Sequence, residues 1–256
     1  MIQSVERAIR ILNALQGSRR LGLSEIASRL QLPASTVHGI VRTLAAHGMV
    51  EQDQGSGRYQ LGPAVLLLGN VYLDTLELSG RAAKWSEELA RRTGMAVRVG
   101  VLLMDEVVIV QHEPRPDGTR QMREVGIVIP AHASALGKAM LAFRPEDRRR
   151  VAEQGSLRAM TGETVVEPQM FEKELNATAA TGIATESDEA VLGDSGVAAP
   201  IFDGERPAMG AVGVVLPTTE YPPQDSVIEA VRETARNLSR ELGASRWPVP
   251  QPEPTS

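Results

Sequence analysis

A polar face on the third predicted helix, over residues 33–48, carries residue types that can read DNA. Ser35, Thr36, His38 and Arg42 recur at helical spacing, opposite the apolar side of the same segment. Small residues near a helix N-terminus permit close approach to the major groove, hydroxyl groups bond phosphates and base edges, and an arginine can pair with guanine. The pattern therefore indicates a recognition helix, and an ordinary solvated helix face is the alternative.

A second pattern could support nucleophilic catalysis. Residues 193–196 read Gly-Asp-Ser-Gly, which resembles the nucleophile motif of trypsin-like serine proteases, with Ser195 as nucleophile and His132 as base. However, Val197 stands where those proteases have glycine, the chain has no cysteine, and the spacing from His132 to Ser195 is too short for two β-barrels. A serine hydrolase is therefore the weaker interpretation, and we expect no enzyme.

Phosphate-loop and metal chemistry find no support in the sequence. Lys138 follows a glycine, but His132 stands at the first glycine position of a phosphate loop and Ala139 stands where serine or threonine is needed. The histidines lack the spacing of a metal site and there is no thiolate ligand; they are His38, His47, His112 and His132. We therefore expect neither a metal nor a cofactor.

Three helices are predicted to position the polar face. Apolar residues at helical spacing mark helices near residues 5–15, 24–30 and 33–48. The second begins at Ser24, a residue type that favours helix starts, and the third begins at Pro33, which fits the first turn of a helix. Residues 24–48 therefore predict a helix-turn-helix.

A hairpin follows these helices directly. Strand-like segments at residues 49–52 and 58–61 flank the glycine-rich turn 53–57. Helix, helix-turn-helix and hairpin in this order are typical of a winged helix. In that arrangement Arg58, at the base of the turn, would lie near a DNA phosphate, and a plain surface arginine is the alternative.

Charge and composition agree with a DNA-binding module attached to a larger body. The first 60 residues hold seven arginines against four acidic side chains, a net charge of +3, whereas the whole chain carries −5. A length of 256 residues, 42% of them hydrophobic and 23% charged, predicts an ordinary globular protein of two domains. No stretch is apolar enough to span a membrane and no signal peptide is apparent, so the cytoplasm is the expected location.

The rest of the chain predicts an α+β protein of two domains. We assign residues 1–62 to the winged helix-turn-helix and 63–93 to linker helices that break at Gly80. Residues 94–245 alternate strands and helices, which predicts a domain with a largely antiparallel sheet. A proline-rich tail over 246–256 is expected to be disordered.

The chain resembles bacterial transcription regulators of the IclR family over nearly its whole length. The matching stretches are residues 3–8, 22–27, 32–38, 42–44, 59–62, 130–139 and 198–203. The resemblance implies a winged helix joined by a helix to an effector-binding domain of GAF-like fold, working as a homodimer or dimer of dimers on a near-palindromic operator. The implied function is a regulator, expected to be a repressor, of a catabolic operon. A metabolite-binding scaffold without specific DNA recognition is the alternative.

Carried over by position, the resemblance places DNA contacts on the predicted helix face, and the winged-helix arrangement adds Arg58 of the wing. With the start of the second helix, the predicted DNA-binding set is Ser24, Ser35, Thr36, His38, Arg42 and Arg58. Ala34 stands where the family often has lysine or asparagine, and Gly39 where it often has arginine. These two departures imply a different operator sequence or more reliance on the wing and the helix ends.

The same resemblance places an effector site in the second domain. It involves Ala135 and Leu136, the acidic Glu186, Gly196 in place of a frequent cysteine, and Gly213 and Val215 in place of a Ser-x-Ser pair. Ala135 and Leu136 as plain core, and Glu186 as a surface or capping residue, are the alternatives. Without those polar groups a small keto acid would lose its hydrogen bonds, which disfavours it as ligand.

Two effector classes remain open. One is a larger or more apolar ligand, such as an aromatic metabolite, that uses the freed space. The other is a polyol or phosphate ester held by Glu186 and by Arg120 or Arg123. The chain also resembles glycerol-operon regulators within the family, in residues 19–24, 50–61 and 239–244, which favours glycerol or glycerol 3-phosphate.

Overall fold

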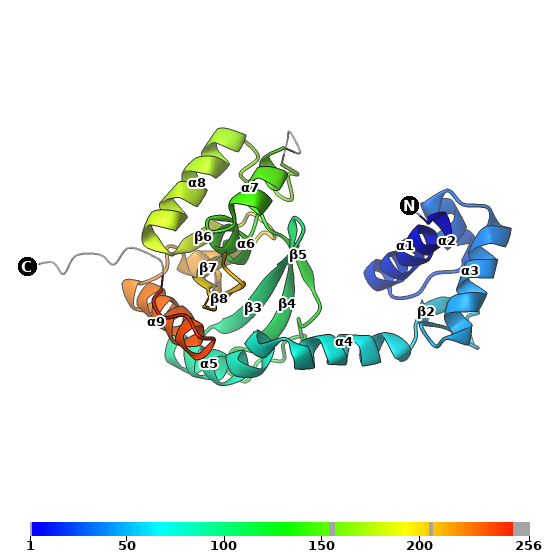
Figure 1. Ribbon diagram of the computed structural model, residues 1–256, viewed down its shortest axis with the longest axis horizontal. Coiled ribbons are helices and arrows are strands. Elements are labelled where there is room, and N and C mark those ends of the chain that lie inside the picture. The colour runs from blue at the N-terminus through cyan, green and yellow to red at the C-terminus, as the bar shows by residue number, and fades with distance from the viewer. Residues whose placement is uncertain (1, 154–156, 205–206, 248–256) are drawn as a thin grey trace, which may run out of the picture. The chain divides into compact units, whose positions relative to one another are not determined.

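The first part of the chain folds into three helices, a hairpin and a fourth helix (Figure 1). The bounds of these elements are α1 Gln3–Ser18, α2 Leu23–Leu30, α3 Ala34–Ala46, β1 Val50–Gln52, β2 Tyr59–Leu61 and α4 Ala64–Thr75. β1 and β2 are antiparallel, with Val50 opposite Leu61. The backbones of Leu21 and Tyr59 exchange two hydrogen bonds and so add a third short strand beside the hairpin. The predicted winged helix is confirmed.

The helices of this unit bury one apolar side each. Ile11 and Leu15 of α1, Ile26 of α2 and Val37 of α3 are fully buried in a common core. At this burial each side chain stabilises the fold by about 1.5–3 kcal/mol. α2 ends because Gln31 adopts the left-handed conformation, and Pro33 precedes the first turn of α3. The core therefore fixes the orientation of α3 and turns its other side outward.

The structure is a computed structural model in which residues 2–153, 157–204 and 207–247 are described. The chain divides into two units, Met1–Thr75 and Leu76–Ser256, each with its own core. Within the described ranges, no helix is both long and apolar enough to cross a membrane, and no group of metal-ligating side chains is assembled. The predicted disordered tail lies outside the described residues from position 248 onward.

A six-stranded antiparallel sheet forms the centre of the second unit. Its strands lie in the order β5-β4-β3-β8-β7-β6. Their bounds are β3 Ala96–Leu103, β4 Glu106–Glu113, β5 Val128–Pro130, β6 Ala184–Ser187, β7 Asp194–Ile201 and β8 Gly210–Pro217. The prediction of an α+β domain with an antiparallel sheet is confirmed.

Helices cover both faces of this sheet (Figure 1). α5 and α9 pack on one face, and α6, with α7 and α8 around it, lies on the other. Their bounds are α5 Glu77–Thr93, α6 Ala135–Leu141, α7 Pro145–Ala152, α8 Pro168–Thr181 and α9 Asp225–Glu241, with a short 3₁₀ turn at Thr218–Glu220. All seven residues of α6 are buried, so this helix is the centre of the core on its face.

One predicted detail of the elements is wrong, and one strand was not predicted. The helical segment breaks at Leu76, whose backbone is extended, and not at Gly80, which lies inside α5. A glycine inside a helix costs only about 1 kcal/mol, which the packing of α5 on β3 and β4 exceeds. β5 was not predicted, because a strand of three residues ending in proline is too short to give a periodic pattern.

Candidate DNA-binding face and ligand pocket

The outward side of α3 presents unpaired polar groups. Ser35, His38 and Arg42 are exposed, while Val37 and Val41 on the opposite side are buried. Among the described residues, the three exposed side chains make no hydrogen bond or ion pair. Thr36 is half-buried, and Gly39 on the same side has no neighbour within 4 Å of the position a Cβ would take. The side of α3 bearing Ser35, His38, Arg42 and Gly39, which we call the α3 face, is open for contact.

The wing residue Arg58 is already engaged within the unit. Its guanidinium lies 2.9 Å from Glu25 and donates a hydrogen bond of 3.3 Å to the carbonyl of Arg20. Glu25 also accepts a 2.6 Å bond from the backbone N–H of Gly22. That bond and the charge of Arg58 hold the pKa of Glu25 below its usual range. Arg58 thereby lies beside the start of α2, where Ser24 is exposed, so the structure brings these two predicted residues together.

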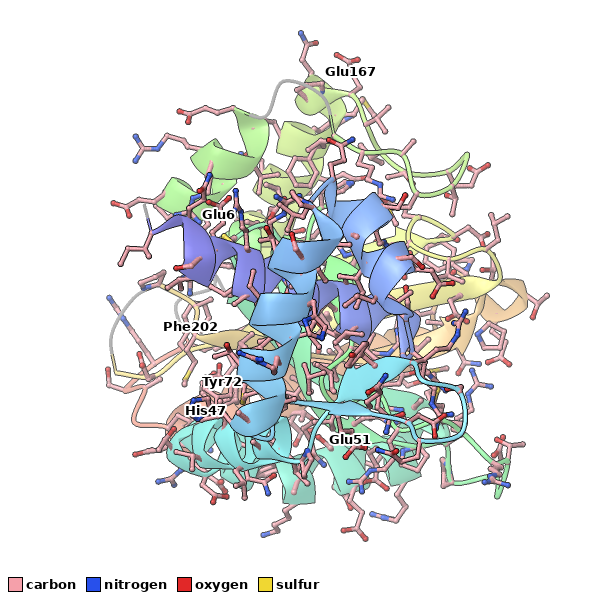
Figure 2. All side chains as sticks on the ribbon, turned by 90° about the vertical axis from the view of Figure 1, so that its right-hand side faces the viewer. Glu6, His47, Glu51, Tyr72, Glu167 and Phe202 are labelled. Atoms are coloured by element: carbon pink, nitrogen blue, oxygen red, sulfur yellow. The ribbon has the colours of Figure 1, made fainter. Side chains whose placement is uncertain are left out.

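The position of α3 in the unit is visible in Figure 2, where His47 and Glu51 mark the end of α3 and strand β1. The wing turn beyond β1 is internally bonded. Asp53 accepts from the Ser56 hydroxyl at 2.6 Å and pairs with Arg20 at 3.2 Å. These bonds hold the hairpin, and with it Arg58, in a defined position relative to α2.

A small pocket of about 160 Å³ lies between the sheet and the segment that leads into α6. Its polar lining residues are Arg98 on β3, Glu124 before β5, Ser134 at the start of α6 and Asp194 on β7. The apolar part of the wall is made by Ile109, Ile127, Ile129, Ala190 and Val191. A volume of this size holds about five water molecules, so it suits a metabolite of a few carbon atoms.

An ion pair dominates the electrostatics of this pocket. The Arg98 guanidinium donates two bonds to the carboxylate of Glu124, one of them 2.9 Å long. Burial opposes the ionisation of Glu124, but the hydrogen bonds and charge of Arg98 outweigh it and lower the pKa of Glu124. The pair is therefore charged at neutral pH.

The effector residues predicted by resemblance lie deeper than the pocket wall. Ala135 and Leu136 are buried at the first turn of α6, directly after the pocket residue Ser134. A Cβ on Gly196 would lie 3.1 Å from Glu186 and 3.3 Å from Ala135. The space that this glycine leaves is therefore filled by its neighbours.

Gly213 and Val215 occupy the middle of β8. Gly213 lies opposite Arg98 of β3, and Val215 lies opposite Gly196 of β7. A Cβ on Gly213 would lie 2.8 Å from the Cβ of Ala198, so no ligand space opens there either. Their strand thus lies between β3 and β7, which both contribute pocket residues, but β8 itself contributes none.

Glu186 is half-buried and lies beside the buried charges Lys138 and Glu189. Burial raises the pKa of Glu186 to about 7, and the nearby carboxylate of Glu189 adds to the effect. Lys138, 1% exposed, lies 2.5 Å from Glu189 and 2.7 Å from Glu174, the latter without hydrogen-bond geometry. Burial likewise raises the pKa of Glu189, against the opposing effect of Lys138.

Arg120 and Arg123 are exposed in the loop between β4 and β5, and neither lines the pocket. The sequence interpretation instead missed Arg98, Glu124, Ser134 and Asp194. Arg98 had a usable signal, because it is the one charged residue in the otherwise apolar strand Ala96–Leu103. Glu124 had none, since its loop shows no periodic pattern.

The structure does not assemble the hydrolase pair. Ser195 is fully buried, and its hydroxyl bonds to those of Ser187 and Thr218, each at 3.0 Å. The Nε2 atom of His132 bonds to the carbonyl of Arg158 at 2.9 Å. No hydrogen bond joins nucleophile and base among the described residues, and the serine has no access to a substrate.

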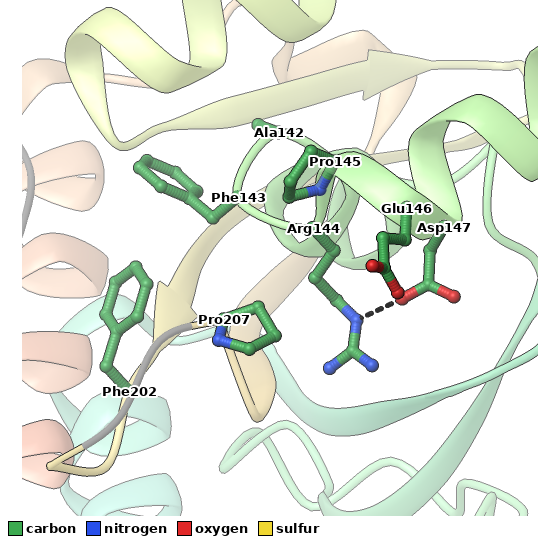
Figure 3. A pocket seen from close by; sticks show the side chains of 8 residues that line it. All are labelled: Ala142, Phe143, Arg144, Pro145, Glu146, Asp147, Phe202 and Pro207. Carbon is green, nitrogen blue, oxygen red and sulfur yellow. Dashed lines mark hydrogen bonds and ion pairs between the residues drawn. The ribbon is translucent and has the colours of Figure 1, made fainter.

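A second cavity, of about 610 Å³, lies where α6 leads into α7 (Figure 3). The rings of Phe143 and Phe202 meet edge to face at 5.3 Å beside it. Arg144 is held by Asp147 at 2.6 Å and by the carbonyl of Ala208 at 2.7 Å. None of the predicted effector residues lines this cavity.

Comparisons with known proteins place both units in one family. Residues 4–54 match the model of the IclR helix-turn-helix domain, and residues 70–240 match that of the bacterial transcriptional regulator IclR C-terminal domain. The chain is 47% identical to a glycerol operon regulatory protein of Streptomyces griseus, over 96% of this chain and 98% of that protein.

Solved structures agree with this result. An IclR transcriptional regulator from Alicyclobacillus acidocaldarius is 28% identical, with a TM-score of 0.81 over 95% of this chain and 100% of that one. An IclR homologue from Microbacterium hydrocarbonoxydans, solved with 4-hydroxybenzoate, shares the fold at 24% identity, with a TM-score of 0.79 over 94% of this chain and 99% of that one. The chain belongs to the IclR family of bacterial transcriptional regulators.

Proposed function

We propose that the protein represses a catabolic operon by binding its operator through the α3 face, and that a small metabolite in the second unit changes this binding. The observation that carries the proposal is the α3 face itself, where Ser35, His38 and Arg42 are exposed and unpaired among the described residues. Unpaired donors on the second helix of a helix-turn-helix are suited to base edges in the major groove. Thr36 would add a contact to a phosphate.

Arg58 and Ser24 would complete the DNA contact. Arg58 is paired with Glu25, so a DNA phosphate must compete with that carboxylate for the guanidinium. Both groups are exposed, and an exposed ion pair is weak enough for a phosphate to replace the carboxylate. On this basis we assign residues 1–62 to DNA binding, 63–93 to the link and 94–245 to the effector.

The effector class follows from the small pocket and from the relatives. The pocket of about 160 Å³ suits a compact polar metabolite. Because the Streptomyces griseus relative is a glycerol operon regulatory protein, glycerol and glycerol 3-phosphate are the first candidates. An aromatic or other organic metabolite is the alternative. The buried position of Ser195 supports a binding protein over an enzyme.

We further infer that the protein acts as a homodimer or a dimer of dimers. α4 exposes a run of large apolar side chains, and none of its residues is buried. The exposed residues are Leu66, Leu67, Leu68, Val71 and Tyr72. An apolar surface of this kind marks a protein contact, and a second copy of the chain suits a near-palindromic operator. Such a protein works in the cytoplasm, where the operator is.

The test is binding to DNA from the promoter of the protein's own operon at physiological salt. Glycerol, glycerol 3-phosphate and a panel of aromatic and keto acids are added in turn. We expect specific binding that one compound releases or strengthens, through a shift between two conformational states. Salt-sensitive binding without sequence preference, unmoved by any compound, would support the scaffold alternative.

Replacement of Arg42 tests the α3 face directly. Arg42→Ala is expected to weaken operator binding by about 1–3 kcal/mol and to relax the preference for one base, because a bidentate pair is lost. Lys173→Ala, which removes a positive charge from the exposed side of α8, is the matched control. Normal operator affinity in Arg42→Ala would exclude base reading by this residue.

A further inference from the structure

Arg98 is an unusual residue for its position. It lies on β3 between Val97 and Val99, both fully buried, and its side chain is 22% exposed. A guanidinium inside a sheet loses hydration, and only a well-placed partner compensates for that loss. A purely structural position on this strand would be filled more favourably by another apolar residue.

The partner of Arg98 comes from a loop and not from the sheet. Glu124 belongs to the segment between β4 and β5, and its carboxylate receives both bonds of the Arg98 fork. The loop is anchored just after Glu124, where Gly126 donates to the carbonyl of Ile109 at 2.8 Å. Glu124 thus lies in the pocket wall and accepts the hydrogen bonds that Arg98 could otherwise donate to a ligand oxyanion.

His112 on β4 lies near Glu124 but does not form a hydrogen bond with it. Its Nε2 atom lies 3.9 Å from the carboxylate, and the side chain is 4% exposed. That nitrogen has no hydrogen-bond partner among the described residues. Burial lowers the pKa of His112, so the ring is neutral near pH 7 and does not supply a competing charge.

The remaining polar groups of the pocket suit hydroxyl groups. The Ser134 hydroxyl accepts a 3.2 Å bond from the N–H of Gly137 and keeps its own proton to donate. The carboxylate of Asp194 has no partner in the described part of the chain and can accept from an alcohol. The pocket therefore offers the Arg98 guanidinium, which can donate two hydrogen bonds to an oxyanion, and acceptor oxygens for hydroxyl groups.

We propose that Arg98 recognises the oxyanion of a small hydroxylated effector, a carboxylate or phosphate monoester, and that Glu124 is a built-in competitor for the same guanidinium. This inference rests on the proposed role of the pocket as effector site. A guanidinium binds a carboxylate and a phosphate with the same two-pronged geometry, so ligand and Glu124 exclude each other. Binding of the ligand releases the carboxylate, and with it the side chain that ties the β4–β5 loop to β3.

The test measures binding of three probes to the full-length protein by calorimetry. The probes are glycerol 3-phosphate, glycerate and glycerol, and the variants are Glu124→Gln and Arg98→Gln. Glu124→Gln removes the competing charge but keeps the side-chain shape. We expect it to bind an oxyanion probe about tenfold more tightly than the wild type, equivalent to about 1.4 kcal/mol. We expect its affinity for glycerol to stay within about twofold, and Arg98→Gln to lose the oxyanion probes.

Two further variants keep the result interpretable. Glu106→Gln makes the same change at an exposed position of β4 outside the pocket and should leave all affinities unchanged. The double variant Arg98→Gln/Glu124→Gln leaves no unpaired charge, so it should fold, as checked by circular dichroism, and still fail to bind oxyanions. The two oxyanion probes separate a preference for phosphate from one for carboxylate.

Several results would overturn the proposal. Equal oxyanion affinity in wild type and Glu124→Gln, or equal tightening for glycerol, would remove the role of Glu124. If glycerol alone binds and alters operator binding, the pocket is an effector site but Arg98 is not its anion receptor. If no probe binds any variant, both this inference and the effector role assigned to the pocket fail.

Discussion

The carboxyl group of Glu186 is protonated over part of the neutral range, because it is half-buried opposite Gly196 and has an acidic neighbour in Glu189. Burial raises its pKa from 4.5 to about 7. The folded protein therefore holds this proton more tightly than the unfolded chain does. The stability that the proton provides is fully present below pH 4.5 and is lost as the pH rises through 7.

Glu186→Gln removes this pH dependence because an amide has no proton to lose. We expect the melting temperature of the wild type to fall further between pH 5 and pH 8 than that of the variant. At pH 8 the variant should be the more stable protein. Thermal denaturation followed by circular dichroism checks this, with Glu106→Gln as an exposed control. Parallel curves for wild type and Glu186→Gln would show that the carboxyl group ionises freely.

The sequence predicts some residues of the candidate sites but not others. The α3 face could be predicted because its residues are close in the chain and a helix fixes their relative positions. The Arg98–Glu124 pair joins residues 26 positions apart through a loop without periodicity, so no local pattern reveals it. Ala135 and Glu186 were predicted by resemblance alone and stay predictions, and the resemblance did not indicate the polar residues of the pocket wall.

Among the helices, α6 illustrates how a sequence can require one residue type. A Cβ on Gly137 would overlap the backbone atoms of Ala131, so only glycine permits the first turn of α6 to lie against that segment. Gly39 in α3 is the opposite case, because nothing lies within 4 Å of its Cβ position. The two glycines therefore respond differently to the same substitution.

Gly137→Ala is expected to destabilise the protein by about 3 kcal/mol, since backbone and not a flexible side chain must move. Gly39→Ala should stabilise it by about 0.5–1 kcal/mol, the difference in helix propensity between the two residues. Urea denaturation monitored by circular dichroism compares the two variants. Similar stability in both would show that the segment at Ala131 moves aside at little cost.

The sequence predicts the type of an element better than its ends. Long amphipathic segments such as α1, α5 and α9 give a clear period. The break at Leu76 was missed because glycine is the stronger local signal for the end of a helix. β5 was missed for another reason, since its pairing with β4 and not its composition makes it a strand.

At the scale of the whole molecule, charge and apolar surface are unevenly distributed. The first 60 residues carry a net +3 and the remaining chain about −8, which concentrates attraction for DNA on the first unit. The exposed apolar residues of α4 belong to the same unit. The first 75 residues thus carry both the excess positive charge and the apolar surface proposed for self-association.

Val71→Glu tests self-association through α4, where Val71 is 63% exposed. A buried unpaired charge at a subunit interface is unfavourable, so we expect the variant to shift to monomer while its circular dichroism spectrum is unchanged. Operator affinity should fall with it, because two linked heads bind far more tightly than one. Sedimentation velocity is the measurement, and Val166→Glu, at a position 40% exposed in the other unit, is the control. An unchanged oligomer would exclude α4 from the interface.

The burial of Lys138 has a consequence for chemical labelling. The chain contains three lysines, and Lys84 and Lys173 are exposed whereas Lys138 is enclosed by acidic side chains. An amine-reactive reagent therefore reaches Lys138 only when α6, α8 and the segment around Glu189 separate. With so few amines, mass spectrometry resolves each site. The labelling rate of Lys138 therefore measures how often the second unit opens.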